Sequence, residues 1–425
     1  MKDTVEKLHD TVFRQLLMRQ DIRSLLTILN DPGEETRLVG GCVRDSFLGK
    51  VVSDIDMATT YKPDEVARRV EEAGLKCIPT GIDHGTVTVL AGTSRFEITT
   101  LRKDIATDGR HAQIVFGRSF EEDAERRDFT INALSVSADG IVHDYWGGLQ
   151  DLKDKKLRFI GKAETRIRED YLRILRFFRF SADYSDKLDD EGFSAAIRER
   201  NGLYRLSRER IQAEFLKILC TTRAEDIVQS LSNSGLLQIL AGGIGNCRRF
   251  CHCAKYEARW QIYPDAIRRL AALCVEIRED VQRLRFRLVL SNRDTERLLR
   301  YAVCLEEVMT QPDRTINAEL IRRFYAEDPA GIPFHESSFF DVRTALGEKF
   351  VLADEKAERE WMTFFTGEAK QPVFPLKGKD IQHLVARGPE MGSLLKKLYH
   401  CWQEWGYPAD EMVYGRLVSE AEKHV

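Results

Sequence analysis

The spacing of hydrophobic residues divides the chain into two stretches of different character. Leucine and valine recur every three or four positions over residues 1–30, which predicts an amphipathic helix that ends at Asp31-Pro32-Gly33. Short β-rich runs and helical segments then alternate to about residue 148. From about Glu164 onward the pattern is almost entirely helical. We therefore expect an α+β fold, in which a small mixed-sheet head is followed by helical domains.

The head contains several short runs with the composition of strands. They cover residues 37–39, 53–58, 86–90 and 96–101. The last two runs are separated by Ala91-Gly92-Thr93-Ser94, which predicts a hairpin. The polar, glycine-containing stretch from Arg102 to Gly117 is expected to be a mobile loop.

Composition excludes several classes of protein. The chain has 425 residues and a formal net charge of -3, which argues against a polybasic protein that coats nucleic acid. No apolar run is long enough for a transmembrane helix, and residues 1–17 lack the pattern of a signal or transit peptide. Nine scattered cysteines indicate reduced thiols and a cytoplasmic location. Cys247, Cys251, His252 and Cys253 cluster, but without a second cysteine pair a zinc site there is disfavoured.

The charge is unevenly distributed along the chain. Residues 151–300 carry 31 Lys and Arg against 22 Asp and Glu, whereas the remainder carries 34 against 46. A basic middle between acidic ends is typical of a local surface for an acidic partner. Five basic residues are candidates to line a path for a nucleic-acid backbone: Arg268, Arg269, Arg283, Arg285 and Arg287.

The densest chemical signal lies between Gly40 and Thr60, in GGCVRDSFLGKVVSDIDMATT. Asp54 and Asp56 are two residues apart on a predicted strand, so both carboxylates face the same side and need a cation between them. Hard oxygen ligands that leave room for phosphate suit Mg²⁺. Upstream, Gly40-Gly41 predicts a turn whose N–H groups can bind phosphates, and Arg44 could pair with one. An isolated D-x-D pair is usually a solvated strand end, but the combination favours a nucleotide site.

Two further segments carry candidate site residues. Glu97 lies between apolar neighbours on a strand that could run beside the one holding Asp54, and it is a candidate third acid; an exposed strand face is the alternative. In Glu125–Leu134, Arg127 or Asn132 could contact a ribose or triphosphate, whereas Asp128 could equally serve as a helix N-cap.

The segment Glu169–Phe180, EDYLRILRFFRF, is predicted to be one helix. Asp170, Arg173, Arg176 and Arg179 recur every three residues, and nearly every other position is apolar. Such a helix is buried, so its arginines need partners, which a polyanionic ligand would supply. Asp170 and Arg173 could together read the edge of cytosine or adenine, which presents an amine beside an acceptor nitrogen. An ordinary i,i+3 ion pair is the alternative.

These motifs resemble those of the class II CCA-adding enzymes, tRNA nucleotidyltransferases of the polymerase-β-like superfamily. The resemblance covers roughly residues 35–220 and includes FEITTLRKD, TDGRHA and ERRDFTINAL. It implies that Asp54 and Asp56 bind the metal, with Glu97 as the third carboxylate. It implies nucleotide-binding roles for Gly40, Gly41, Arg44, Arg127, Asp170, Arg173, Arg176 and Arg179. The implied partners are tRNA, through its acceptor end and T arm, with CTP and ATP as substrates and no obligatory protein partner.

The resemblance also implies a division into four parts. We expect a nucleotidyltransferase head over 1–148, a neck over 149–222, a body over 223–330 and a tail over 331–425, the last three helical. The expected reaction adds C, C and A to the tRNA 3′ end and releases pyrophosphate by a two-metal mechanism. A bacterial-type poly(A) polymerase is the closest alternative, although residues 301–425 lack the basic excess of such enzymes. A CC-adding enzyme and a non-catalytic tRNA-binding protein are further alternatives.

Overall fold

The computed structural model of the chain describes most of its 425 residues. The described residues are 4–7, 16–52, 54–82, 85–92, 94–107, 112–311, 315–327, 337–347, 351–365, 368, 372–385, 388–408 and 412–424. The chain forms two compact units, of which one comprises Met1–Glu214 with Thr221–Arg223 and the other Phe215–Cys220 with Ala224–Val425. The predicted head and neck therefore fall largely in the first unit, and the predicted body and tail in the second. The boundaries within each unit stay a prediction.

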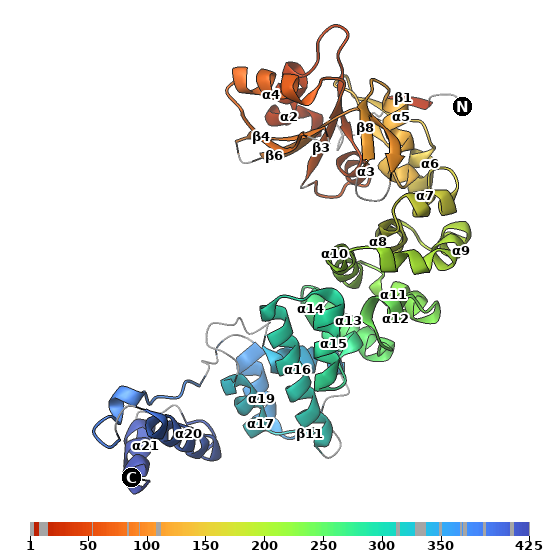
Figure 1. The fold of residues 1–425 in the computed structure, drawn as a ribbon. Coiled ribbons are helices and arrows are strands. Elements are labelled where there is room, and N and C mark those ends of the chain that lie inside the picture. The colour runs from red at the N-terminus through yellow and green to blue at the C-terminus, as the bar shows by residue number, and fades with distance from the viewer. Residues whose placement is uncertain are drawn as a thin grey trace. The chain divides into compact units, whose positions relative to one another are not determined.

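An eight-stranded mixed sheet forms the centre of the first unit (Figure 1). The strand order is β1-β10-β9-β2-β3-β6-β5-β4, and every neighbouring pair is antiparallel except β3 and β6. The strands are β1 Thr4–Lys7, β2 Thr36–Val39, β3 Ile55–Thr59, β4 Lys76–Gly81, β5 Thr86–Ala91, β6 Ser94–Thr100, β9 Ser135–Val136 and β10 Ile141–Asp144. The hairpin expected at residues 91–94 is confirmed, as is the position of Glu97 beside the aspartate-bearing strand.

Two expectations for the head are wrong. Residues 4–7 form an edge strand that pairs with β10 instead of joining a helix, and α2 covers only Gln20–Ile28 of the expected helix. Residues 8–15 lie outside the described residues. The expected loop at 102–117 is instead a two-stranded antiparallel ribbon, β7 Arg102–Thr107 and β8 Ala112–Phe116. β-branched residues in both strands favour this pairing. The hydrogen bonds between the strands also satisfy backbone N–H and C=O groups, which in a loop would have to bond water.

The helices of the first unit are short near the sheet and longer after it. They are α3 Gly41–Phe47, α4 Pro63–Glu72, α5 Phe120–Glu125, α6 Gly148–Lys153, α7 Ala163–Glu169, α8 Leu172–Tyr184, α9 Asp190–Arg198 and α10 Arg208–Leu219, with 3₁₀ turns η2 Thr130–Asn132 and η3 Arg200–Arg205. The helix expected over 169–180 thus begins at Leu172, and Asp170 lies in an extended break after α7. Phe129, Phe159, Phe177 and Phe180 pack their rings together and fix α8 against the segment that carries Asp128.

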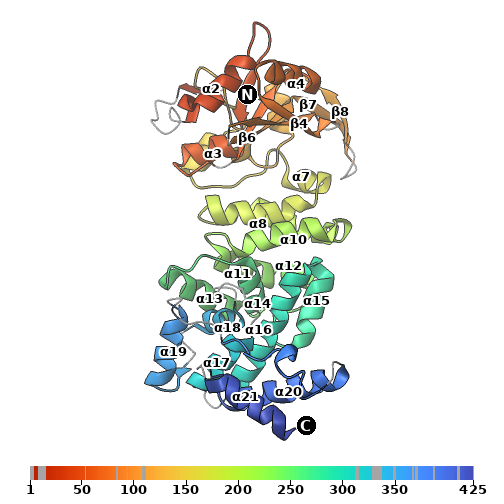
Figure 2. The same ribbon diagram turned by 90° about the vertical axis from the view of Figure 1, so that its left-hand side faces the viewer.

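The second unit is helical, apart from a two-residue parallel pair of strands, β11 Thr315–Ile316 and β12 Val351–Leu352. Its helices are α11 Ala224–Asn233, α12 Leu236–Ala241, α13 Cys247–Arg259, α14 Ala266–Cys274, α15 Arg278–Leu288, α16 Asn292–Thr310, α17 Ala318–Glu327, α18 Ser338–Leu346, α19 Glu355–Phe365, α20 Pro389–Glu404 and α21 Met412–Lys423, with the 3₁₀ turn η7 Gly378–Asp380 (Figure 2). None of the described helices combines the length and apolar character needed to cross a membrane.

Buried ion pairs connect the helices of the second unit. Arg268 and Arg269 both bond Glu257, at 2.7 Å each, and all three side chains are almost fully buried. Arg283 and Arg287 donate to backbone carbonyls of neighbouring segments. The expectation that Arg268 and Arg269 line a nucleic-acid path is therefore wrong, because both guanidiniums are used within the helical core. Their positive charge alone could not distinguish a buried network from a basic surface.

Candidate active site

Three carboxylates gather where β3 and β6 run side by side. Asp54 is exposed immediately before β3, and Asp56 lies half-buried within it. Parallel pairing places Asp56 opposite Glu97 of β6. Burial, together with the charges of Glu97 and Asp54, raises the pKa of Asp56 in spite of the nearby Arg127. The neighbouring parts of β3 and β6 therefore carry negative charges that repel one another, and a bound cation would lower this repulsion.

Exposure and pairing bear on how the carboxylates could bind a cation. Glu97 is exposed and pairs with Arg95 at 2.7 Å. Among the described residues, the oxygens of Asp54, Asp56 and Glu97 do not all approach within 4.8 Å of one another. The donor chemistry of all three carboxylates fits a hard divalent ion, and Glu97 has a second oxygen beside the one that pairs with Arg95. A cavity of about 180 Å³ adjoins the two strands, and its lining includes Asp56, Glu97, Asp123, Arg126 and Arg127.

The glycine turn is built as the sequence predicted. Gly40 has φ +72°, and its N–H donates to the Leu134 carbonyl at 3.0 Å. A Cβ at Gly40 would stand 2.8 Å from Nη1 of Arg127, so the turn requires glycine for both its backbone angle and its space. Gly41 begins α3, whose first backbone N–H groups have no partner within the helix.

Arg44 lies on α3 but is held within the protein. Its guanidinium bonds both carboxylate oxygens of Asp45, at 3.0 and 2.9 Å, and the Oδ1 of Asn132 at 2.5 Å. The guanidinium also lies over the rings of Tyr184 and Phe180, and the side chain is buried. These bonds use three of the five N–H donors of the guanidinium, so Arg44 can pair with a phosphate through its remaining donors or by exchanging one of these partners.

Arg127 and its neighbours organise the segment after α5. Arg127 bonds Asp123 at 3.1 Å and donates to the Asn132 carbonyl at 3.2 Å. Asp128 does not cap a helix, contrary to one expectation; it accepts from the N–H of Phe129, from Nδ2 of Asn132 and from Arg176. Burial would raise the pKa of Asp128, but the charge of Arg176 and these hydrogen bonds outweigh burial and lower it.

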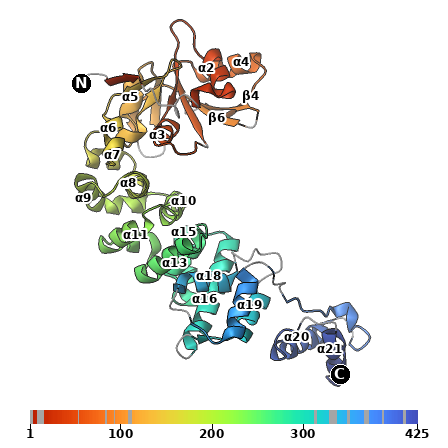
Figure 3. The ribbon, with the colours of Figure 1, turned by 180° about the vertical axis from the view of Figure 1, so that it is seen from behind.

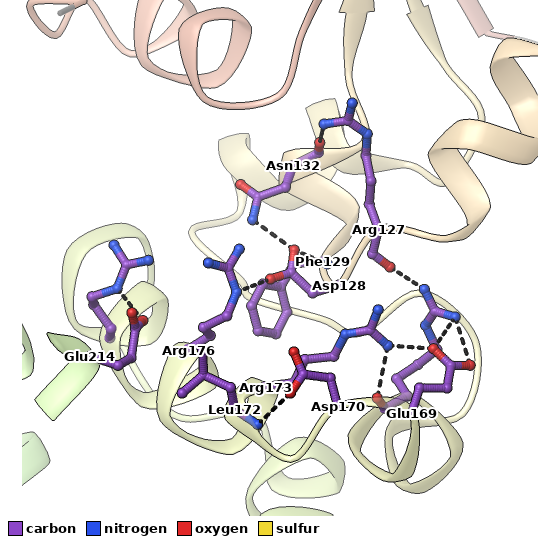
Figure 4. A network of polar contacts seen from close by, with 12 residues as sticks. Arg127, Asp128, Phe129, Asn132, Glu169, Asp170, Leu172, Arg173, Arg176 and Glu214 are labelled. Carbon is purple, nitrogen blue, oxygen red and sulfur yellow. Dashed lines mark hydrogen bonds and ion pairs between the residues drawn. The ribbon is translucent and has the colours of Figure 1, made fainter. Parts of the chain in front are cut away.

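Asp170 and Arg173 stand at the start of α8 without pairing directly. A carboxylate oxygen of Asp170 accepts the Leu172 N–H at 3.1 Å (Figure 4). The other oxygen pairs with Arg210 at 2.7 Å. Arg173 bonds Glu169 at 2.5 Å and donates to the Arg126 carbonyl at 3.1 Å. The expected alternative, an intrahelical Asp170–Arg173 ion pair, is wrong because Asp170 precedes the helix and other residues occupy both side chains.

The other two arginines of α8 have carboxylate partners in the protein. Arg176 bonds Asp128 at 2.6 Å (Figure 4). Arg179 bonds Glu214 at 2.5 Å and lies over the Phe180 ring. From the sequence we inferred that a polyanionic ligand supplies the partners of Arg176 and Arg179. That inference is wrong, because carboxylates of the protein supply them. The arginines are paired before any ligand binds, so they hold α8 to its surroundings.

The structure also identifies site residues that sequence reasoning missed. Glu169 stands four residues before Arg173, a spacing that signals an ion pair on helical backbone and could have been noticed. Arg210 and Glu214 come from α10, about 40 residues from their partners, and no local pattern connects them. Cys247, Cys251, His252 and Cys253 all lie on α13 and do not form a three-donor metal cluster in the described structure.

The chain was compared with known families and structures. Residues 36–158 match the family described as Poly A polymerase head domain, and residues 187–244 match the probable RNA and SrmB-binding site of polymerase A. The mitochondrial CCA tRNA nucleotidyltransferase 1 of Mus musculus is 32% identical over 399 residues, which are 92% of this chain and 88% of the relative.

Solved structures agree on the fold. The Bacillus stearothermophilus CCA-adding enzyme in complex with CTP superposes with a TM-score of 0.72 at 24% identity, covering 98% of this chain and 99% of the other. The Thermotoga maritima CCA-adding enzyme complexed with tRNA_CCA gives a TM-score of 0.64 at 18% identity, with 99% and 97% covered. The similarity to the mouse enzyme extends over nearly the whole of both chains, so this chain belongs to the CCA-adding tRNA nucleotidyltransferases.

Proposed function

We propose that this protein adds C, C and A to the 3′ end of tRNA, using CTP and ATP and releasing pyrophosphate. The observation that carries the proposal is the combination of full-length family membership with an intact Asp54, Asp56 and Gly40-Gly41 beside one another in the fold. A protein that only binds tRNA has no need to keep two aspartates whose mutual repulsion is costly without a cation.

The family's reaction is metal-dependent, and we assign the metal here as Mg²⁺. Asp54 and Asp56 would hold it by their carboxylate oxygens, with Glu97 as a third acid. Such an ion lowers the pKa of an attacking hydroxyl and neutralises charge on the leaving pyrophosphate. The protein's own part is to align the tRNA 3′ hydroxyl with the α-phosphate of the nucleotide.

Nucleotide phosphates would bind at the Gly40-Gly41 turn. The N–H groups at the start of α3, which have no partner within the helix, and the guanidinium of Arg127 supply donors there. Arg127 already lies against Gly40, and its charge partner Asp123 keeps it in place. Arg44 would join by exchanging Asn132 for a ribose or phosphate oxygen.

Base selection would fall to Asp170 and Arg173. A carboxylate that accepts from an amine and a guanidinium that donates to a ring nitrogen match cytosine and adenine, and they mismatch uracil and guanine. Arg210 and Glu169 hold the two side chains before the base arrives, which lowers the entropy lost on binding. Arg176 and Arg179 would act mainly by fixing α8, since both are paired with carboxylates.

All nine cysteines are free thiols, which fits a reducing compartment such as the cytoplasm. The mouse relative is named mitochondrial, and a reducing mitochondrial matrix would be equally compatible with free thiols.

The metal assignment is tested by replacing Asp54 with alanine. Incorporation of labelled CTP into tRNA lacking its last three nucleotides should fall by at least about 1000-fold, because the ion's stabilisation of the transition state is worth several kcal/mol. Binding of tRNA in a gel-shift assay should be unchanged. Asp64→Ala, which removes an exposed aspartate in the first turn of α4, is the matched control and should retain full activity. Retained activity in Asp54→Ala would exclude the assigned role.

A further inference from the structure

A second cluster of metal-binding side chains lies far along the chain, between α20 and α21. The two helices pack side by side in the second unit (Figure 3). Their shared core includes Leu398, Trp402, Val413 and Leu417, all buried. The indole of Trp402 donates to the Pro408 carbonyl at 2.8 Å, which fixes the connection between the helices. The relative position of the facing side chains is therefore set by a packed core.

Three chemically different donors meet at the edge of this core. The sulfur of Cys401, a carboxylate oxygen of Glu420 and a ring nitrogen of His424 all lie within 4.8 Å of one another. Among the described residues, no other set of three such side chains meets this spacing. Glu420 and His424 are four residues apart, with Oε1 and Nε2 separated by 3.7 Å, and Cys401 reaches them from the other helix.

Hydrogen bonding orients the carboxylate toward the other two donors. Lys423 bonds Oε2 of Glu420 at 2.9 Å, which leaves Oε1 facing His424. Partners of this kind commonly fix the orientation of metal ligands. Cys401 and Glu420 are partly buried, whereas His424, which directly follows α21, is exposed.

We propose that Cys401, Glu420 and His424 form a binding site for a divalent ion of the zinc class. A thiolate and an imidazole favour zinc over magnesium or calcium, which prefer oxygen ligands. On binding, the thiol proton is released to solvent, and the thiolate and carboxylate together balance the two positive charges of the ion. Three protein ligands leave the fourth tetrahedral position for water. The ion would join α20 to α21 and is independent of the carboxylates on β3.

Cobalt(II) is a suitable probe, because it takes the place of zinc, gives intense visible bands in tetrahedral sites and shows a charge-transfer band when a thiolate is a ligand. The full-length protein, freed of metal by chelation, would be titrated with Co²⁺ and then with Zn²⁺. We expect one equivalent of Co²⁺ to produce thiolate charge-transfer and visible bands, and Zn²⁺ to displace it. Zn²⁺ should also raise the melting temperature of the second unit, whereas Mg²⁺ should not.

Variants identify the ligands. Loss of residues that merely support a ligand costs 10- to 100-fold in affinity, so Cys401→Ser and His424→Ala should each weaken Co²⁺ binding by about 100-fold or more. Cys247→Ser, in another partly buried cysteine, and His400→Ala are the matched controls. His400 also pairs with a glutamate four residues away, at 3.5 Å from Glu404, but belongs to no three-donor set.

The Co²⁺ spectra of the variants and controls decide whether the site exists. Bands that disappear in Cys401→Ser and His424→Ala, and persist in both controls, support the site. Absence of the bands, or bands that survive in Cys401→Ser, would overturn the proposal. Circular dichroism of each variant without metal verifies that the helices form, so that a lost band reports a lost ligand.

Discussion

Replacing Arg176 with methionine removes the charged partner of a buried carboxylate. Asp128 has only 7% of its side chain exposed, and Arg176 bonds it at 2.6 Å. Methionine keeps most of the aliphatic length of arginine and can still pack against Phe180, whose ring lies beneath the guanidinium. The substitution therefore tests the ion pair with little change in packing.

The expected loss of stability follows from what remains around Asp128. Removing one partner of a fully buried pair costs about 3–5 kcal/mol. Asp128 keeps hydrogen bonds from Asn132, at 3.0 Å, and from the Phe129 N–H, at 2.9 Å, and about a third of Arg176 is exposed. We therefore expect a loss of about 2–3 kcal/mol at pH 7, below the fully buried case.

The pH dependence has a defined sign. In the native protein the pKa of Asp128 is lowered, so its contribution to stability is present above its unfolded pKa of about 3.9 and is lost as pH falls through the lower folded value. Without Arg176, the effect of burial, which disfavours the charged carboxylate, is no longer outweighed. The pKa of Asp128 therefore rises. The carboxyl is then protonated at mildly acidic pH, so the deficit of Arg176→Met should shrink as pH falls from 7 toward 4.

Hydrogen exchange followed by mass spectrometry measures the opening free energy locally, which suits a chain of two units. In Arg176→Met, peptides that contain residues 128 and 176 should be less protected than in the wild type at pH 7. This difference in protection should be smaller at pH 5, after correction for intrinsic exchange rates. Arg198→Met removes an exposed pair with Glu164 and should cost less than about 1 kcal/mol. Wild-type protection with a raised KM for CTP and ATP would refute this reasoning and assign Arg176 to direct nucleotide contact.

Three further predictions concern other parts of the molecule. Arg173→Ala should relax rejection of UTP and GTP by at least about tenfold, measured as relative kcat/KM, whereas Arg168→Ala on an exposed neighbour should not; unchanged selectivity would exclude base reading. Gly40→Ala should lower kcat/KM and cost about 1–2 kcal/mol in urea unfolding, because a left-handed alanine is strained and displaces Arg127. Arg268→Met should destabilise the second unit by about 3–5 kcal/mol but leave the salt dependence of tRNA binding unchanged; a smaller salt slope would place its guanidinium on the RNA.

Local patterns predicted those parts of the site that depend on neighbouring residues. The Gly40-Gly41 turn and the hairpin before Glu97 both follow from turn chemistry. The shared face of Asp54 and Asp56 stays a prediction, because β3 begins at Ile55 and Asp54 precedes it. The parallel pairing that brings Asp56 opposite Glu97 joins segments about 40 residues apart. The sequence indicated that the two strands could be neighbours, but it could not predict which residues lie opposite each other.

Helix boundaries and ion partners were predicted less well, for physical reasons. Asp170 interrupts the helical pattern because its side chain accepts the Leu172 N–H, an alternative to a helical hydrogen bond that aspartate readily makes. No glycine or proline marks this break. The apolar spacing at the start of the chain fits a helix as well as a strand. Residues 4–7 form a strand because they pair with β10. Carboxylate partners such as Glu214 come from distant helices and could not be identified before the fold was known.

An enzyme that builds the CCA end extends tRNA by a fixed sequence of three nucleotides. The most direct measurement incubates the purified protein and Mg²⁺ with tRNA that lacks its last three nucleotides, in separate reactions with CTP, with ATP and with both. Resolution of the products by length should show two added nucleotides with CTP alone, three with both, and none with ATP alone. Long adenylate tails with ATP alone would contradict the account and identify a poly(A) polymerase.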